Sequence, residues 1–289
     1  MIRLGLIGYP LSHSLSPVIQ TAALQSCGLE GDYSLFPIEP EDQQGLRDLL
    51  DRVRRSEIQG LNVTIPHKQN VIDFLDELTP TAKAIGAVNT IYKRGHQLVG
   101  ENTDAPGFLS DLKRFLATVP YGHDKTLRHG ELRALVLGAG GSARAVIYAL
   151  LQDGWKVTIA ARRMDQAQQL MSSFPDHKLH ITDFAFSNTH ISNISLIVNT
   201  TPVGMSPNVN QSPWPKNLPF SAGAGIYDLV YNPRETRLVR DARSQGRPAT
   251  TGLGMLIEQA MLAFEIWTGH RPSRETMLAS ATQSLISSL

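Results

Sequence analysis

A lysine near a strand end offers the first chemistry in this sequence. In residues 60–68, GLNVTIPHK, apolar residues alternate with Asn62 and Thr64, which predicts a strand with one face in the core and polar groups on the other. Pro66 is expected to begin a helix and to place Lys68 in its first turn, where the helix dipole disfavours a cation. A lysine in such a place is suited to proton transfer, and the alternative is an ordinary surface lysine.

An aspartate could serve as the partner of this lysine. Asn102-Thr103-Asp104 stands just before Pro106 and a predicted helix. One interpretation makes these residues the cap of that helix. The other makes Asp104 a carboxylate that faces Lys68, orients its ammonium and helps it to bind a hydroxyl of the substrate. The residues alone leave both interpretations open.

Hydroxyl and amide groups stand at two further places. Ser14 and Ser16 follow the first predicted strand, where Ser16 could cap a helix opened by Pro17 or the two hydroxyls could bind a carboxylate. Gln259 lies on the apolar side of the helix predicted at 255–267, so it needs a partner, either a substrate hydroxyl or a backbone group. No histidine stands at metal-ligand spacing, and we expect no metal.

A glycine-rich loop follows the strand predicted at 133–137. The loop reads Gly138-Ala139-Gly140-Gly141-Ser142-Ala143 and runs into a helical pattern, which is the G-x-G-x-x-G/A fingerprint in its required context. The glycines allow a tight turn and close approach to a pyrophosphate, and the helix N-terminus attracts the phosphates. We therefore predict a dinucleotide site at Gly138, Ala139, Gly140, Gly141 and Ser142. A turn without ligand and an S-adenosylmethionine enzyme are the competing interpretations.

The end of the next predicted strand, 156–160, indicates which dinucleotide binds. An NAD enzyme usually carries an acidic residue there for the ribose 2′-hydroxyl. This chain has Ala161-Arg162-Arg163, and two guanidinium groups suit the 2′-phosphate of NADP because they form charge-assisted bidentate hydrogen bonds. NADP is therefore the expected cofactor. Asp165 keeps NAD as a minority interpretation, and a solvated strand end is the alternative for the arginines.

The elements that must position these residues alternate between strand and helix, which predicts an α/β fold with crossover helices. A second βαβ series begins at Leu132. The helix at 255–267 follows its last strand and is expected to return to the first part, whereas the polar stretch 118–130 is expected to be a surface loop. The strands are predicted at 2–7, 33–38, 60–65, 87–92, 97–100, 133–137, 156–160, 196–199, 225–229 and 248–250.

Chain length, net charge, apolar runs and cysteine count narrow the class of protein. The chain has 289 residues, enough for two domains, and a net charge of +1 that makes no overall case for nucleic acid binding. Its start reads as a strand and not as a signal peptide, and no apolar run approaches the roughly 20 residues of a membrane span. With one cysteine, an internal disulfide is excluded. We expect a cytoplasmic protein that binds neither nucleic acid nor membrane.

Taken together, these segments resemble the shikimate dehydrogenase (shikimate/quinate dehydrogenase) family nearly end to end. Chance explains any one of the shared motifs but not the ordered set. The motifs are Ser14-Leu15-Ser16-Pro17, Asn62-Val63-Thr64-Ile65-Pro66-His67-Lys68, Gly86-Ala87-Val88-Asn89-Thr90, Asn102-Thr103-Asp104, Gly138-Ala139-Gly140-Gly141-Ser142, Asn199-Thr200-Thr201-Pro202-Val203-Gly204-Met205, Tyr227-Asp228-Leu229-Val230-Tyr231-Asn232-Pro233 and Gly252-Leu253-Gly254-Met255-Leu256.

The resemblance implies an NADPH-dependent, reversible reduction of 3-dehydroshikimate to shikimate on the route to chorismate and the aromatic amino acids. It also implies two domains: residues 1–103 plus 253–289, with a mixed sheet, would bind substrate, and residues 104–252 would form a Rossmann-type NADP domain, with a hinge between them. The resemblance further implies that Lys68 and Asp104 are the catalytic pair. The substrate carboxylate would bind to Ser14, Ser16 and Tyr231, and the ring hydroxyls to Thr64, Asn89, Asp104 and Gln259. Leu229 and Gly252 would line the nicotinamide side of the cofactor site.

One departure from the family pattern bears on the cofactor. NADP-specific members usually carry Asn-Arg-Thr where this chain has Ala161-Arg162-Arg163, so the central arginine is kept and its neighbours are not. A quinate/shikimate dehydrogenase that prefers NAD is therefore one alternative, and a non-catalytic, NADP-binding redox sensor is another. The residues leave open whether the protein is a homodimer.

Overall fold

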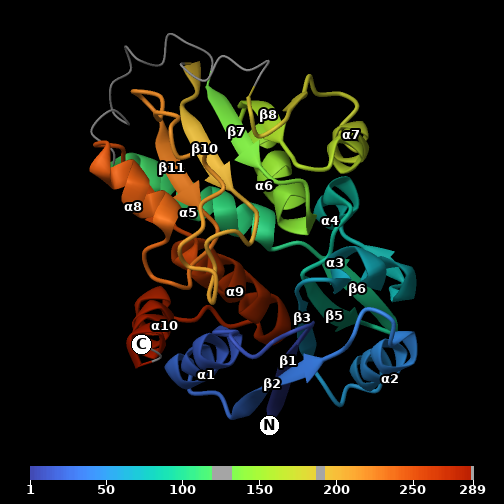
Figure 1. The fold of residues 1–289 in the computed structure, drawn as a ribbon. Helices are drawn as coiled ribbons and strands as arrows, with labels where there is room; N and C mark the ends of the chain where they lie inside the picture. Colours follow the sequence, from blue (N-terminus) through green and yellow to red (C-terminus); the bar gives the residue numbers. More distant parts are fainter. Residues whose placement is uncertain (119–131, 187–192, 288–289) are drawn as a thin grey trace. The chain divides into compact units, whose positions relative to one another are not determined.

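The computed structural model describes residues 1–118, 132–186 and 193–287, so the stretch predicted as a surface loop lies almost wholly outside the described residues. The chain folds into two compact units (Figure 1). Unit 1 combines Met1–Gly107 with Leu256–Leu289, and unit 2 is the continuous segment Phe108–Met255. The predicted α/β fold, with one mixed and one parallel sheet, is confirmed.

Unit 1 is built on a six-stranded mixed sheet in the order β2-β1-β3-β5-β6-β4. β1 pairs in parallel with β2 and β3, β5 is antiparallel to β3 and β6, and β4 runs parallel to β6. The carboxyl ends of β1 and β3 therefore meet at one edge of the sheet. The strands span Ile2–Gly8 (β1), Gly31–Pro37 (β2), Gly60–Val63 (β3), Glu77–Leu78 (β4), Thr90–Arg94 (β5) and Gln97–Glu101 (β6).

The central position of β3 corrects one expectation. All four of its residues are buried, and β1 and β5 flank it on either side. The side chain of Asn62 is 5% exposed and so lies in the interior, whereas the alternating pattern was expected to present it outward. Thr64 follows the strand and is half-buried.

The helices of unit 1 bury their apolar sides against this sheet and against one another. In α2 the carboxylate of Asp42 caps the helix by accepting the Gly45 N–H at 2.8 Å, and Leu46, Leu49, Leu50 and Val53 turn to the core. The helices that lie wholly or partly in unit 1 are Ser16–Ser26 (α1), Gln43–Arg54 (α2), His67–Asn70 (α3), Val71–Phe74 (η1, a 3₁₀ turn), Pro80–Ile85 (α4), Asp104–Thr118 (α5), Leu253–Thr268 (α9) and Arg274–Ser287 (α10).

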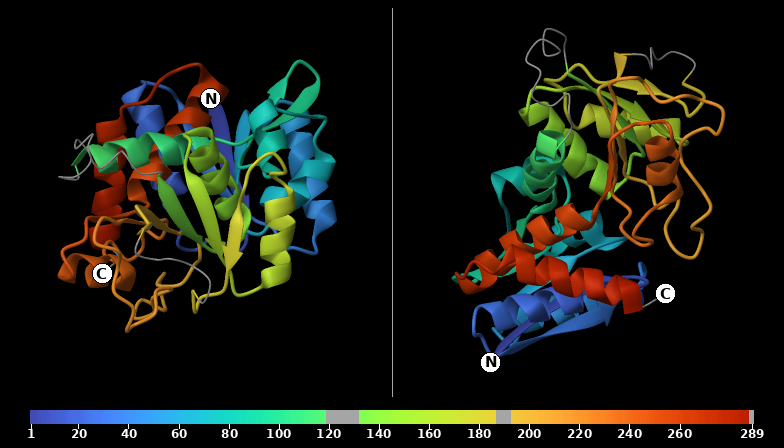
Figure 2. Two further views of the ribbon diagram at one scale, coloured as in Figure 1. Left: turned by 90° about the horizontal axis from the view of Figure 1, so that it is seen from above. Right: turned by 90° about the vertical axis from the view of Figure 1, so that its left-hand side faces the viewer.

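The last two helices complete unit 1 after the chain has passed through unit 2. α10 buries Met277, Ala281 and Leu285 and packs on α1, beside which it lies in Figures 1 and 2. The indole N–H of Trp267 in α9 donates to the carbonyl of Ile91 in β5 at 3.0 Å. The predicted return of this helix to the first part of the chain is therefore confirmed.

Unit 2 is built on a six-stranded parallel sheet in the order β12-β11-β10-β7-β8-β9. The chain winds outward from β7 in one direction and then from β10 in the other, which is the Rossmann order with a switch point between β7 and β10. Ligands of such sheets bind at the carboxyl ends of the strands near that point. The strands span Arg133–Leu137 (β7), Lys156–Ala160 (β8), His180–Thr182 (β9), Leu196–Asn199 (β10), Gly225–Asp228 (β11) and Ala249–Thr251 (β12).

The helices between these strands are α6 (Gly141–Gln152), α7 (Met164–Ser172) and α8 (Arg237–Ser244). The inner strands are mainly apolar, as expected of a parallel sheet covered on both faces, with the polar residues Asn199 and Asp228 at the ends of β10 and β11. Trp214 stacks on Phe220 within the core of this unit. Among the described residues, no helix is both long enough and apolar enough to cross a membrane.

Candidate active site

Lys68 and Asp104 meet in unit 1 as an ion pair. The ammonium nitrogen Nζ lies 2.6 Å from Oδ2 of Asp104, and the two side chains are 12% and 7% exposed. Lys68 stands in the four-residue helix α3, which residues 64–66 separate from the end of β3. Asp104 is the first residue of α5, where a carboxylate suits the positive end of the helix. A nearly dry ion pair holds the ammonium in one place and leaves its other N–H bonds to a ligand.

Asn89 holds the second oxygen of the carboxylate. Its amide nitrogen donates to Oδ1 of Asp104 at 2.9 Å, to the hydroxyl of Thr103 at 2.9 Å and to Oε1 of Gln259 at 3.3 Å. Its amide oxygen accepts the Thr103 N–H at 2.7 Å. Asn89 therefore orients Asp104 and ties Gln259, from α9, to the same cluster.

The helix cap at α5 belongs to a neighbour of Asp104. The side chain of Asn102 accepts the N–H of Ala105 at 3.2 Å and donates to the carbonyl of Ala87 at 2.9 Å. Asp104 is thus free of the capping role that was its alternative interpretation, and its carboxylate serves Lys68 and Asn89.

A buried polar layer beneath this cluster was not anticipated. Asn62 accepts the hydroxyl of Tyr33 at 2.8 Å and donates to the carbonyl of Asn89 at 3.2 Å, and Thr90 bonds to the Asn89 amide oxygen at 3.1 Å. Burial raises the pKa of Tyr33, and a hydrogen bond with the Ser16 hydroxyl offsets part of this rise. The alternation in β3 predicted that Asn62 lies on the face opposite Leu61 and Val63. Only the pairing of β3 with β5 shows that its amide forms hydrogen bonds inside the protein.

The two serines lie where the chain enters α1, and Ser16 does not cap that helix, which was one of its two interpretations. Ser16 is the first helical residue, Leu15 occupies the cap position without a side-chain bond, and Pro17 follows in the first turn. The Ser14 hydroxyl accepts the Ser16 N–H at 3.2 Å. No described residue bonds to the side chain of Thr64, so the structure does not join this hydroxyl to the Lys68 cluster.

In unit 2 the glycine loop has the backbone that a dinucleotide needs. Gly138 has φ +112°, and a Cβ there would lie 2.6 Å from Oγ1 of Thr200, so only glycine fits. Gly140 caps α6, and a Cβ there would meet no atom within 4 Å. The first N–H groups of a helix find no partner within it, so this open space at the start of α6 suits an anion, while Ala143 is fully buried. These residues fit a pyrophosphate.

Beyond β8, Ala161 is buried and the side chains of Arg162 and Arg163 are exposed. Arg163 caps α7 through its backbone position alone, since its side chain makes no capping bond. Both residues therefore follow the carboxyl end of β8, at the edge of the parallel sheet where such folds bind dinucleotides.

The loops after β10 and β11 share this edge. Asn199 ends β10, and its side-chain oxygen accepts the N–H of Thr201 at 2.9 Å. The Thr200 hydroxyl donates to the Leu137 carbonyl at 2.7 Å. The Leu229 N–H donates to the carbonyl of Asn199 at 2.9 Å. The carbonyl oxygen of Leu229 and the Cα of Gly252 are so close that a Cβ at residue 252 would overlap that oxygen.

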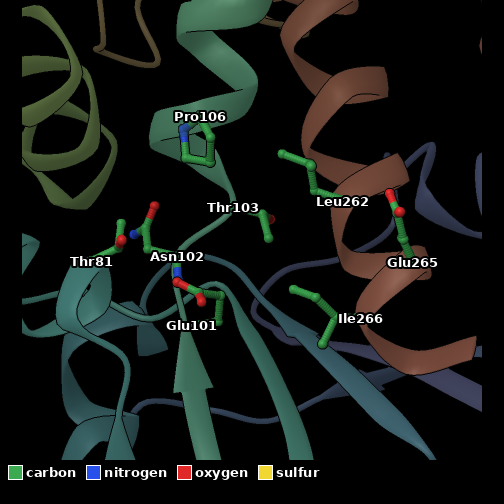
Figure 3. Close-up of a pocket in the computed structure, with 8 residues that line it drawn as sticks. All are labelled: Thr81, Glu101, Asn102, Thr103, Pro106, Leu262, Glu265 and Ile266. Carbon is green, nitrogen blue, oxygen red and sulfur yellow. The ribbon is translucent and has the colours of Figure 1, made fainter. Parts of the chain in front are cut away.

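A separate pocket of about 270 Å³ lies in unit 1, between α9 and the start of α5 (Figure 3). None of the predicted site residues lines it; its wall is formed by Thr81, Glu101, Asn102, Thr103, Pro106, Leu262, Glu265 and Ile266. Within the described ranges, no three His, Cys, Asp or Glu side chains are placed to hold a metal ion.

Comparison with known proteins decides the family. Residues 6–91 match the shikimate dehydrogenase substrate-binding domain, residues 123–210 the shikimate/quinate 5-dehydrogenase family, and residues 252–282 the shikimate 5′-dehydrogenase C-terminal domain. The shikimate dehydrogenase (NADP(+)) of Bacillus subtilis is 38% identical over 94% of this chain and 94% of that protein.

The chain belongs to the shikimate dehydrogenase family.

Two other members of the shikimate dehydrogenase family match this chain over nearly its whole length. The shikimate dehydrogenase (NADP(+)) of Salinibacter ruber is 42% identical over 91% of this chain and 90% of that protein. The structure of the Thermus thermophilus enzyme in complex with NADP(H) and shikimate superposes with a TM-score of 0.85 at 37% identity, over 98% of this chain and the whole of that one.

Proposed function

We propose that this protein is an NADP-dependent shikimate dehydrogenase that reversibly reduces 3-dehydroshikimate to shikimate in the biosynthesis of chorismate and the aromatic amino acids. The observation that carries the proposal is the Lys68–Asp104 pair, nearly dry and 2.6 Å long, in a chain of this family. The glycine loop of unit 2 supports the dinucleotide half of the reaction.

The proposed chemistry needs no metal. Bound NADPH supplies a hydride, which reduces the ketone carbon of the substrate. Lys68, as an ammonium, gives a proton to the oxygen that becomes the hydroxyl, so one hydride and one proton complete the reduction. Asp104 keeps that ammonium in place and, through Oδ1, is itself held by Asn89.

Substrate recognition is proposed for the polar side chains of unit 1, with Ser14 and Ser16 on the carboxylate and Thr64, Asn89, Asp104 and Gln259 on the ring hydroxyls. Tyr231 of unit 2 is proposed to help the serines. The cluster supports this assignment in part, because the Gln259 amide nitrogen uses one N–H on the Leu256 carbonyl and keeps the other for a ligand. The Asn89 amide already has protein partners, so orienting Asp104 is its first role.

NADP binding is proposed for residues 138–142, for the segment 161–163 and for the loops that carry Leu229 and Gly252. Correspondingly, residues 1–103 plus 253–289 would be the substrate-binding catalytic domain and residues 104–252 the NADP domain. The exposed pair Arg162 and Arg163 supports NADP over NAD, because an acidic ribose ligand is missing from this strand end.

The decisive experiment is a matrix of substrates and cofactors. Initial rates of the purified protein are measured with shikimate and with quinate, each with NADP⁺ and with NAD⁺. We expect the highest kcat/KM for shikimate with NADP⁺. A preference for quinate or for NAD⁺ would indicate the quinate/shikimate paralogue, and a protein that binds NADPH but turns over neither acid would be the non-catalytic redox sensor.

A further inference from the structure

Asp228, at the end of β11, is a buried carboxylate that the proposed chemistry does not use. It has no exposed surface, and it accepts hydrogen bonds from the Asn199 amide at 2.8 Å, the Val230 N–H at 3.0 Å and the Thr236 hydroxyl at 2.6 Å. These donors are uncharged, and burial raises the pKa of Asp228 to about 6 despite them. Burying a carboxylate among neutral groups costs stability, so the position calls for a compensating role.

The first donor links Asp228 to the glycine loop. Asn199 gives its amide N–H to Asp228, and its amide oxygen accepts the N–H and the hydroxyl of Thr201 at 2.9 and 2.7 Å. The adjacent Thr200 bonds to the Leu137 carbonyl, immediately before Gly138. The carboxylate therefore orients the Asn199 amide, which in turn fixes the loop packed against the glycine turn.

The other two donors fix the chain that follows β11. The Val230 N–H bond folds residues 228–230 back on the carboxylate, and so sets the direction of the Leu229 carbonyl beside Gly252. Thr236 uses its hydroxyl twice, as the cap that accepts the Val239 N–H at 3.2 Å and as a donor to Asp228. One carboxylate thus joins the end of β10, the end of β11 and the start of α8.

We propose that Asp228 is a positioning residue of the dinucleotide site, which holds the loops after β10 and β11 in the form that binds the nicotinamide end of NADP(H). The inference rests on the proposed function, because that function assigns Leu229 and Gly252 to the nicotinamide side. Asp228 acts through Asn199 and the 229–230 backbone and does not itself contact the cofactor.

The informative variant is Asp228→Asn, which keeps the shape of the side chain. An asparagine has one acceptor oxygen in place of two, and its amide would confront the Thr236 hydroxyl with a donor. The matched control is Asp153→Asn, because Asp153 is a carboxylate of unit 2 that also accepts a neutral donor, the indole N–H of Trp155 at 3.2 Å. Asp153 caps the C-terminal end of α6, whereas the glycine loop leads into the N-terminal end of that helix.

The primary measurement is the Kd of NADPH from its fluorescence on titration into each protein without substrate, with KM for NADPH and for 3-dehydroshikimate as the second readout. For Asp228→Asn we expect Kd and KM for NADPH to rise about tenfold, equal to about 1.4 kcal/mol, with KM for 3-dehydroshikimate within about twofold of wild type. Asp153→Asn should leave the Kd of NADPH within about twofold, because its partners Trp155 and Lys113 lie outside the loops that Asp228 joins. An unchanged Kd in Asp228→Asn, or an equal loss in both variants, would overturn the proposal.

A second pair of variants covers the case in which Asp228→Asn does not fold. Thr236→Val removes one donor to the carboxylate, whereas Thr236→Ser keeps the hydroxyl and should restore wild-type Kd. If Thr236→Val binds NADPH as tightly as Thr236→Ser, the positioning role is refuted. The proposed function fails separately, through a wild-type protein that binds NADPH and does not act on shikimate, because the titrations require no turnover.

Discussion

The two carboxylate oxygens of Asp104 have different partners, the ammonium of Lys68 and the amide of Asn89. Lys68 can therefore act on a ligand while Asn89 orients the carboxylate. Oδ2 faces Lys68 and Oδ1 faces Asn89, so the carboxylate cannot turn without breaking one of the two bonds. Gln259 reaches the same cluster from α9, far along the chain. The lysine is the only member of this cluster that can supply a proton as a cation.

Replacement of Lys68 by Met tests that assignment. The variant keeps an unbranched side chain and removes the ammonium, so we expect kcat to fall by about a hundredfold or more while the Kd of NADPH stays unchanged. Lys93→Met is the control, because Lys93 is a lysine of the same unit whose ammonium bonds to Ser56 in an exposed contact. Turnover at the wild-type level in Lys68→Met would exclude the lysine from the chemistry.

The arginines after β8 make a prediction about cofactor choice. Arg162→Ala should raise KM for NADPH about tenfold or more and leave KM for NADH nearly unchanged, because only NADPH carries the 2′-phosphate that a guanidinium binds. Rates with both cofactors, measured for Arg162→Ala and Arg163→Ala, show which guanidinium is used. An equal rise in KM for the two cofactors would mean that the arginine does not bind the 2′-phosphate.

Asp228 predicts a dependence of stability on pH. Its pKa in the folded protein, about 6, is above the ordinary 3.8, so the native state holds this proton more tightly than the unfolded chain does. The contribution of this group to the free energy of unfolding is therefore fully present below pH 3.8 and is lost as the pH rises through about 6. Urea unfolding of wild type and Asp228→Asn between pH 4 and 8 should show wild type losing stability relative to the variant as the pH rises to about 6. A constant difference would contradict this.

At the scale of elements, the strands of unit 2 were the most predictable part of the fold. The bounds expected for β7, β8 and β10 agree with the structure, because buried parallel strands are short, continuous apolar runs. The two-residue β4 and the three-residue β9 carry too little pattern to be recognised. Helices α7, α8 and α10 were likewise not assigned from the sequence, although the amphipathic pattern of α8 and its cap at Thr236 were a usable local signal.

The site was predictable in its residues and less so in their contacts. Motif spacing placed Lys68 beside a strand end and Asp104 before a helix, and the structure brings them together. The capping role of Ser16, one of its two interpretations, does not hold because the helix begins one residue earlier than a cap at that serine requires. The buried bonds of Asn62 depend on the antiparallel pairing of β3 with β5, which no local pattern determines.

The packing of α10 makes a prediction for this element. Met277 is fully buried where α10 lies on α1, so Met277→Ala should leave a cavity and lower the free energy of unfolding by about 2 to 4 kcal/mol. Thermal unfolding followed by circular dichroism measures the loss. The exposed Met164→Ala, 37% accessible in the native state, should change stability little. Equal melting temperatures for the two variants would show that α10 does not stabilise unit 1.

At the scale of the whole molecule, the proposed assignment of one ligand to each unit predicts where each ligand slows amide hydrogen exchange. A ligand present at 100 times its Kd stabilises the state that binds it by about 2.7 kcal/mol. We expect NADP⁺ alone to slow amide hydrogen exchange mainly within residues 132–186 and 193–255, and shikimate alone to slow it mainly within residues 1–107 and 256–287. Exchange measured by mass spectrometry with each ligand tests this. Protection of the same peptides by both ligands would contradict the assignment.

Unit 1 is discontinuous, whereas unit 2 is one uninterrupted segment between its two parts. During synthesis on a ribosome, β1 to β6 emerge first but lack α9 and α10, including Gln259 and the helix that covers α1. The residues of unit 2 are translated before most of α9 and before all of α10. A nascent chain that stops near Met255 therefore holds every residue proposed for the dinucleotide site, while the proposed substrate site lacks Gln259 until the final segment is made.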